Sequence, residues 1–402
     1  MSQDSVHSTD DSAKLYNQFL AKNYAAAAIT LVKGKGTRVW DAQGKTYLDF
    51  ASGIAVNAVG HAHPVMVKKI AEQAVKLIHV SNLYRNEPQA KLAESLSKYC
   101  GSGRFLFCNS GAEANEALLK LARLHGKKKS GVEGKCIGIV VAEKAFHGRT
   151  FGGMSATPQE KIQNGFRPLL SGFSTAPLND IKAWDKAISS TETAAVLLET
   201  IQGEGGVFVA DRAFLRELHA ICKARNVLFL IDEIQCGIGR AGKFFAYEHS
   251  GVKPDAIAMA KGLGGGLPLG AMIAIGPAAH LLKPGEHGST FGGNPVSCAA
   301  GLAAIQEIEK KSLNEKALEL GEFLKSELLK IEGVTEVRGR GLLLGIVLEK
   351  DWAKEIANFL MAKGVLVNAP NANTIRIAPP LIVTKAECSK FVKIFAEVIA
   401  NG

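Results

Sequence analysis

Lys261 is the residue of this chain whose type and position could do covalent chemistry. It ends the stretch Asp255-Ala-Ile-Ala-Met-Ala-Lys261, whose small and apolar residues predict a buried strand, and a glycine-rich turn follows. A poorly solvated lysine amine has a lowered pKa and can attack a carbonyl carbon to form a Schiff base. A structural lysine that extends its charged end to solvent is the alternative. Taken alone, the stretch favours that alternative, so the interpretation depends on other motifs.

A second motif is compatible with either a phosphate site or a helix cap. The segment Asn109-Ser-Gly-Ala-Glu-Ala-Asn115 follows a short predicted strand and opens a helix predicted over 113–125. Ser110 and Glu113 have the spacing of a capping box, which is a structural device. The free backbone N–H groups at such a helix N-terminus, with a glycine beside them, also bind phosphate. The segment by itself supports both interpretations equally.

Two further groups of residues have types that could face a ligand at the same sheet edge. Asp232 follows the most apolar strand, at the edge of an α/β sheet where ligands bind. A buried aspartate needs a cationic partner, and a protonated ring nitrogen or a structural ion pair would serve equally. In Phe146-His147-Gly148-Arg149 the aromatic ring could stack on a planar cofactor and the arginine could bind a carboxylate. In isolation, loop packing with a surface ion pair is favoured for that stretch.

A nucleotide site is a weaker alternative. Gly237-Ile-Gly-Arg-Ala-Gly242-Lys243 matches the spacing GxGxxG and nearly matches a P-loop. Phe244 stands where a P-loop has Ser or Thr, and five residues separate the predicted strand from Gly237. His61 and His63 lack the spacing of a helical metal motif, so they are predicted to be structural, and no metal site is expected.

The elements that position these residues alternate between strand and helix from about residue 104 onwards, which is typical of a parallel α/β sheet. A hairpin around Asp41–Gly44 precedes this region, and helices are predicted from Pro64 to about His79 and over Gln89–Tyr99. Beyond residue 312 the pattern becomes that of an appended α+β module, with helices over 313–331 and 352–363 and from about Thr384. Strands are predicted over 105–107, 136–141, 194–198, 227–231, 256–259, 272–275, 334–337, 342–347, 365–367 and 374–377, and a helix over 211–225.

Composition predicts a cytoplasmic protein. The 402 residues carry a net charge of +10, but the basic residues are scattered, so neither a nucleic acid nor a membrane partner is expected. The seven cysteines include no CxxC pair, which indicates reduced thiols. The first twelve residues are polar and acidic, unlike a signal peptide, and no apolar run approaches the length of a membrane span.

The motifs, taken in order, resemble those of the class III (ornithine-type) pyridoxal-phosphate aminotransferases. Glu199-Thr-Ile-Gln-Gly-Glu-Gly205 and Ser289-Thr-Phe-Gly-Gly-Asn294 complete the set, and the similarity runs from Gly53 to Pro380. The resemblance implies the aspartate aminotransferase-like fold, PLP fold type I. A large α/β domain with a central, mostly parallel sheet would span 61–312. The hairpin segment 1–60 and residues 313–402 would form a small α+β domain.

The resemblance also implies a role for each candidate residue. Lys261 would form the Schiff base with pyridoxal 5′-phosphate and shuttle the proton, and Asp232 would pair with the ring nitrogen. The other cofactor contacts would be Gln235 at the phenolate oxygen, Phe146 stacked on the ring, His147, and Ser110, Gly111 and Ala112 at the phosphate. Ala112 departs from the Thr often found there, so one hydroxyl contact would be missing. Thr290 would reach the cofactor of the partner in a homodimer.

The substrate residues follow from the same resemblance. Arg149 would bind the substrate carboxylate, with Ser289 and Tyr84 also in contact with the substrate. Arg376 would pair with Glu199 while the amino donor is bound and be freed to bind the carboxylate of glutamate. Asn82-Leu-Tyr84 resembles the branch that transfers the δ-amino group of N2-acetylornithine to 2-oxoglutarate in arginine biosynthesis. Ornithine, succinylornithine, 4-aminobutyrate and succinyl-diaminopimelate are alternative donors on the same scaffold.

Overall fold

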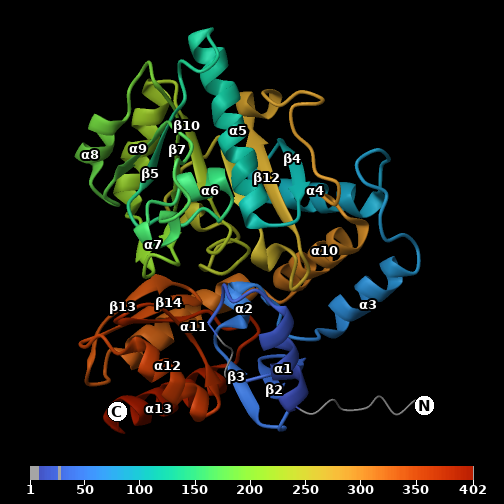
Figure 1. Ribbon diagram of the computed structural model, residues 1–402, viewed down its shortest axis with the longest axis vertical. Helices are drawn as coiled ribbons and strands as arrows, with labels where there is room; N and C mark the ends of the chain where they lie inside the picture. Colours follow the sequence, from blue (N-terminus) through green and yellow to red (C-terminus); the bar gives the residue numbers. More distant parts are fainter. Residues whose placement is uncertain (1–8, 26–28, 402) are drawn as a thin grey trace.

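The computed structural model describes residues 9–25 and 29–401 of the chain (Figure 1). Residues 1–8, which make up most of the polar start, lie outside the described part. Within the described part, no helix has both the length and the apolar character needed to cross a membrane.

A seven-stranded sheet forms the centre of the upper part of the molecule in Figure 1. β10 pairs in parallel with β7 and with β11, whereas β12 runs antiparallel to both of its neighbours. The predicted mostly parallel sheet is therefore confirmed, with β12 as the exception. In spatial order the strands are β4 (Gly103–Cys108), β12 (Gly270–Ile275), β11 (Ala256–Met259), β10 (Leu228–Asp232), β7 (Thr193–Glu199), β5 (Gly138–Ala142) and β6 (Phe173–Ala176).

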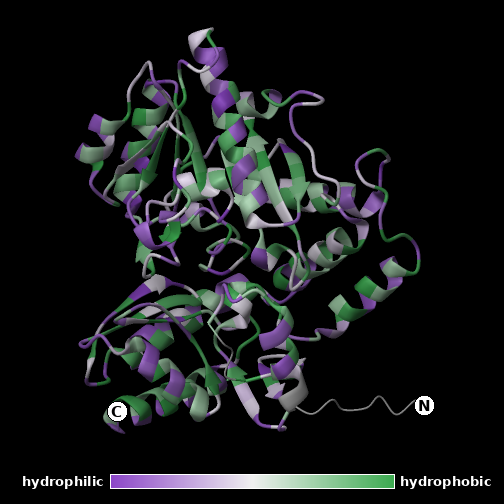
Figure 2. Cartoon of the chain, in the orientation of Figure 1, coloured by the Kyte–Doolittle hydropathy of each residue, from purple (hydrophilic) through white to green (hydrophobic). Residues whose placement is uncertain are grey.

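Helices cover both faces of this sheet, which is why its central strands are apolar throughout (Figure 2). Successive side chains of a strand point to opposite faces. In β10, Leu230 packs in the core cluster that contains residues of α5 (Gly111–Ser130). Its neighbours Phe229 and Ile231 pack in the cluster that contains residues of α9 (Arg212–Ala224).

The chain ends together form the lower part of the molecule (Figure 1). β1 (Leu31–Lys35), β2 (Arg38–Asp41) and β3 (Thr46–Asp49) form the predicted antiparallel hairpins, and β15 (Val365–Leu366) joins them beside β3. A second sheet has the order β13 (Val334–Arg340), β14 (Leu343–Leu348), β17 (Thr374–Ile377) and β16 (Asn368–Asn371). Helices α11 (Leu313–Leu328), α12 (Ala353–Ala362) and α13 (Lys385–Asn401) belong to the same C-terminal region.

Some elements differ from the prediction. α3 (Pro64–Ala74) begins at Pro64 as expected but ends before His79. Val75 is 86% exposed and Ile78 is 63% exposed, so no core is available to support a further turn. β6 was not predicted, because this short edge strand has mostly exposed or half-buried side chains. The remaining elements are α1 (Thr9–Phe19), α2 (Ser52–Ala55), α4 (Glu87–Cys100), α6 (Phe151–Ser155), α7 (Glu160–Gln163), α8 (Ile181–Ala187), β8 (Ile201–Gln202), β9 (Phe208–Val209) and α10 (Pro295–Lys310).

Candidate active site

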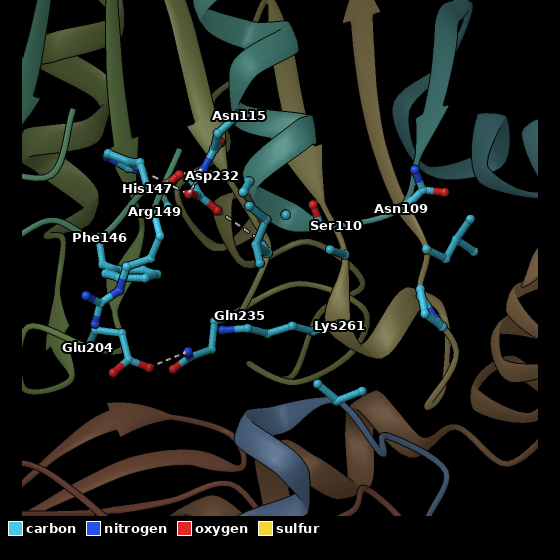
Figure 3. Close-up of a pocket in the computed structure, with 18 of the residues that line it drawn as sticks. Asn109, Ser110, Asn115, Phe146, His147, Arg149, Glu204, Asp232, Gln235 and Lys261 are labelled. Atoms are coloured by element: carbon cyan, nitrogen blue, oxygen red, sulfur yellow. Dashed lines mark hydrogen bonds and ion pairs between the residues drawn. The ribbon is translucent and has the colours of Figure 1, made fainter. Parts of the chain in front are cut away.

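A cavity of about 450 Å³ lies at the carboxyl edge of the central sheet (Figure 3). The N-terminus of α5, the loops after β5, β7 and β10, and the residues after β11 form its walls. Segments far apart in the sequence therefore meet at one place. Most of the predicted site residues line this cavity: Ser110, Gly111, Ala112, Phe146, His147, Arg149, Glu199, Asp232, Gln235 and Lys261.

The N-terminus of α5 presents free hydrogen-bond donors to the cavity. Ser110 is the N-cap, and its Oγ accepts a hydrogen bond from Glu113 N at 3.2 Å. Glu113 Oε2 accepts from Asn109 N at 2.8 Å, so the carboxylate reaches one residue further back than in a standard capping box. In the described chain, the N–H groups of Gly111 and Ala112 have no acceptor. Together with the positive end of the helix dipole, they form a site for an anion.

Asp232, at the end of β10, is buried in a network of hydrogen bonds. Its Oδ2 accepts from Asn115 Nδ2 at 2.8 Å and lies 2.8 Å from His147 Nδ1, and its Oδ1 accepts from Ile234 N at 2.9 Å. Asn115 also donates to His147 O at 2.8 Å. These bonds fix the orientation of the carboxylate and stabilise its charge. The site prediction did not include Asn115, although this residue ends the motif at the start of α5.

Lys261 follows β11 and extends its side chain across the cavity towards Gln235 (Figure 3). Its backbone is in the left-handed region, with φ of 45°, which is uncommon for a residue other than glycine. In the described part of the chain, Lys261 Nζ has no hydrogen bond and no salt bridge. Burial lowers the pKa of Lys261, and the negative charge of Glu204 opposes this effect only in part. An amine in this setting is nucleophilic.

Glu199, at the end of β7, lies beside Asp232 because the two residues are in register on paired strands. Glu199 Oε2 accepts a hydrogen bond from Phe146 N at 3.1 Å. Burial, with a further contribution from the charge of Asp232, raises the pKa of Glu199 well above its ordinary value. The carboxyl group of Glu199 is therefore harder to ionise than that of a solvent-exposed glutamate.

The predicted pairing of Arg376 with Glu199 is wrong. Arg376 Nη1 lies 2.5 Å from Glu204 Oε1 and donates to Gln235 Oε1 at 3.1 Å, and its Nη2 donates to Asn368 Oδ1 at 2.6 Å. Glu199 is held by the backbone of Phe146 instead. Glu204 is the second glutamate of the motif that begins at Glu199, and it was not among the predicted site residues. Only the packing distinguishes the two glutamates.

The other predicted site residues occupy different positions. Phe146 is half-buried and Arg149 is exposed, and both line the cavity. Tyr84 is 72% exposed and does not line it. Neither Ser289 nor Thr290 lines it, but Ser289 Oγ accepts from Asn109 Nδ2 at 3.2 Å, next to the cavity. The contact of Thr290 with a partner's cofactor concerns a second chain and stays a prediction.

The glycine-rich loop at 237–242 is not a nucleotide site in this fold. It does not line the cavity, and a Cβ added to Gly242 would lie 2.9 Å from the side chain of Leu318. The loop therefore packs against the C-terminal region. His61 Nε2 lies 2.7 Å from Asp49 Oδ2, a structural contact. Across residues 9–25 and 29–401, no group of three or more His, Cys, Asp or Glu side chains could hold a metal ion.

Comparison with known proteins agrees with this arrangement. The family model described as Aminotransferase class-III matches residues 19–399. The acetylornithine aminotransferase of Caldanaerobacter subterraneus is 46% identical over 388 residues, which are 96% of this chain and 98% of the relative. The acetylornithine aminotransferase of Aquifex aeolicus is 46% identical over 382 residues, which are 95% of this chain and 100% of the relative.

Solved structures agree with the fold. The ornithine aminotransferase of Toxoplasma gondii matches with a TM-score of 0.94 and 31% identity over 98% of this chain and 96% of the other. The acetylornithine aminotransferase of Elizabethkingia anophelis matches with a TM-score of 0.88 and 34% identity over 98% of this chain and 100% of the other. The predicted fold class is therefore confirmed.

Proposed function

The chain belongs to the class III aminotransferases, and we propose that it transfers the δ-amino group of N2-acetyl-L-ornithine to 2-oxoglutarate. The products are N-acetyl-L-glutamate 5-semialdehyde and L-glutamate, and the reaction is a step of arginine biosynthesis. The names of relatives that match nearly the whole chain support acetylornithine as the donor. Ornithine is the second candidate, because the Toxoplasma gondii structure is named for it.

Pyridoxal 5′-phosphate is the cofactor, and the residues of the cavity fit it. The free N–H groups of Gly111 and Ala112 would hold its phosphate, and the fixed carboxylate of Asp232 would hold a proton on its ring nitrogen. The aromatic ring of Phe146 would stack on the cofactor ring. Lys261 would hold the cofactor covalently through Nζ. The observation that carries the proposal is this unpaired amine in a cavity that also contains the anion site and Asp232.

The residues around the cofactor would then direct the chemistry. When bound, pyridoxal phosphate supplies a carbonyl carbon for the amino group and a protonated ring that withdraws electrons from the reacting carbon. Lys261 Nζ, with its lowered pKa, is suited to move a proton at that carbon. Asp232 would keep the ring nitrogen protonated, because Asn115 and His147 hold its carboxylate in place.

Two arginines would recognise the substrates. Arg149 would bind the carboxylate at the far end of either substrate, since its fork of N–H groups matches a carboxylate. Arg376 would stay paired with Glu204 while acetylornithine is bound and would bind the carboxylate next to the reacting carbon of glutamate. One cavity could then process both half-reactions of a ping-pong cycle.

We also propose a homodimer in the cytoplasm. Ser289, Thr290 and Tyr84 do not line the cavity of their own chain, which is compatible with roles at a site shared with a partner. All seven cysteines are free thiols, and most are buried, as expected in a reducing compartment.

Absorbance and kinetics test the proposal. The purified protein is expected to be yellow, and Lys261→Ala is expected to remove both the colour and turnover. A preparation that stays colourless with added pyridoxal phosphate would refute the cofactor site. To test the donor, kcat/KM is compared for acetylornithine, succinylornithine and ornithine with 2-oxoglutarate. A clear preference for ornithine would refute the acetylornithine assignment.

A further inference from the structure

A second cavity lies on the other side of Glu204. Its volume is about 440 Å³, and Glu204 lines both this cavity and the one that contains Lys261. Its walls come from the loop after β5, the start of α7, the segment 204–208 and the C-terminal region. Its polar lining is dominated by cations and amides: Lys144, Lys161, Arg338, Gln159, Asn371 and Asn373.

Lys144 is built into the wall of this second cavity. Its backbone has φ of 60°, in the left-handed region that residues other than glycine rarely adopt, and Gln159 Nε2 donates to its carbonyl oxygen at 3.1 Å. A Cβ added to Gly205 would lie 2.8 Å from Lys144 O and 3.3 Å from Lys144 Cβ. Lys144 therefore packs directly on the residue that follows Glu204. A strained residue that is held this firmly often serves a function.

In the described residues, the Lys144 ammonium group is not paired with an anion. Its Nζ lies 4.7 Å from the centre of the Phe208 ring, in a cation–π contact. In the described part of the chain it has no hydrogen bond and no salt bridge. Arg338, which lies over the same ring, is already paired, because its Nε lies 2.7 Å from Glu336 Oε2 and its Nη1 donates to Gly206 O. In the described part of the chain, Lys144 and Lys161 are thus the two lysines of this cavity without an acceptor, and Lys144 is the one that packs on the residue after Glu204.

Glu204 needs a new partner when a substrate carboxylate binds Arg376. Glu204 Oε1 accepts from both Arg376 and Gln235. Under the proposed function, it would give up the interaction with Arg376 in the half-reaction with glutamate. A carboxylate that leaves its guanidinium partner without gaining another cation raises the free energy of the complex. The second cavity lies next to Glu204 and has an excess of positive charge.

We propose that Lys144 binds the Glu204 carboxylate in the second cavity while a substrate carboxylate occupies Arg376. The proposal rests on the two half-reactions of the proposed function and makes Lys144 a positioning residue for only one of them. In the half-reaction with acetylornithine, Glu204 stays on Arg376, and Lys144 has no part in it. Lys144 therefore strengthens the binding of glutamate and 2-oxoglutarate without touching either of them.

The two half-reactions of Lys144→Met are measured separately by the absorbance change of the holoenzyme. The half-saturating concentration of 2-oxoglutarate is expected to rise about fivefold, because a partly exposed ion pair contributes about 1 kcal/mol. The half-reaction with acetylornithine is expected to stay within about twofold of the wild type on the same basis. Lys144→Arg is expected to restore 2-oxoglutarate binding. Lys161→Met removes a charge from the same cavity and is expected to have the smaller effect.

A double mutant tests whether Lys144 acts through Glu204. With Glu204→Gln there is no carboxylate to bind, so adding Lys144→Met is expected to change 2-oxoglutarate binding no further. An equal effect of Lys144→Met with and without Glu204 would overturn the proposal in favour of a general attraction of anions. An unchanged half-saturating concentration in the single variant would also overturn it. If the wild type itself fails to consume acetylornithine, the proposed function fails, and this outcome is distinguishable from both.

Discussion

Glu204→Gln is expected to shift the preference of the enzyme towards glutamate and 2-oxoglutarate. Arg376 Nη1 lies 2.5 Å from Glu204 Oε1, and only 3% of the Arg376 side chain and 28% of the Glu204 side chain are exposed. Glutamine keeps the size of the side chain and can still accept a hydrogen bond, but it removes the negative charge. A substrate carboxylate then competes with a weaker partner for the guanidinium.

The size of the shift follows from the strength of the lost interaction. Glutamine keeps a hydrogen bond to the charged guanidinium, so the substitution removes the attraction between two charges, which contributes about 1 kcal/mol in a partly exposed pair. The substitution therefore reduces the free energy needed to release Arg376 by about 1 kcal/mol. We expect the ratio of kcat/KM for glutamate to kcat/KM for acetylornithine to rise by about fivefold.

The measurement is steady-state kinetics of each half-reaction with the holoenzyme. Glu160→Gln is a matched control, because Glu160 also lies 2.5 Å from an arginine, Arg167, but both side chains are more than half exposed. This control is expected to leave the ratio unchanged. If Glu204→Gln also leaves the ratio unchanged, Arg376 is not the group that distinguishes the two substrates, and the reasoning is refuted.

Three further substitutions test the packing around the site by urea denaturation of the cofactor-free protein. Asn115→Ala removes one of the hydrogen bonds that hold Asp232 and is expected to lower the free energy of unfolding by about 1.5–3 kcal/mol; a smaller loss would mean that the network relaxes around the gap. Burial raises the pKa of Glu233 to about 8. Between the pKa of Glu233 in the unfolded state and pH 8, only the folded state holds this proton. The free energy of unfolding therefore falls by about 1.4 kcal/mol per pH unit as pH rises through this range, as far as Glu233 is concerned. Glu233→Gln is expected to remove that slope, and an unchanged slope would contradict the assignment. Arg240→Met leaves the carbonyl oxygens of residues 342 and 379 without their buried donor and is expected to destabilise the protein by at least about 2 kcal/mol, so an unchanged denaturation midpoint would disprove this role.

Local sequence determined the elements and the chemistry that they carry. Continuous apolar runs such as 228–231 predict strands buried on both faces, and the structure places helices on both faces of that strand. The N-cap spacing of Ser110 and Glu113 predicts the start of α5 and its anion site, because both depend on residues a few positions apart. The position of Lys261 after a short apolar strand likewise follows from local pattern. The failures were also local: β6 is too short and exposed to give a pattern, and α3 ends where its apolar residues find no core.

Tertiary structure decided the partners. Asp232 is fixed by Asn115 and His147, residues 117 and 85 positions away, and no local spacing identifies such contacts. The sequence could not show that Arg376 pairs with Glu204 and not with Glu199, because both glutamates belong to one motif and only the packing of β7 turns Glu199 towards the backbone of Phe146. The second cavity beside Lys144 exists only where the loop after β5 meets the C-terminal region. Side-chain chemistry and short-range periodicity can be read from the sequence, whereas the pairing of charges depends on distances that only the folded chain sets.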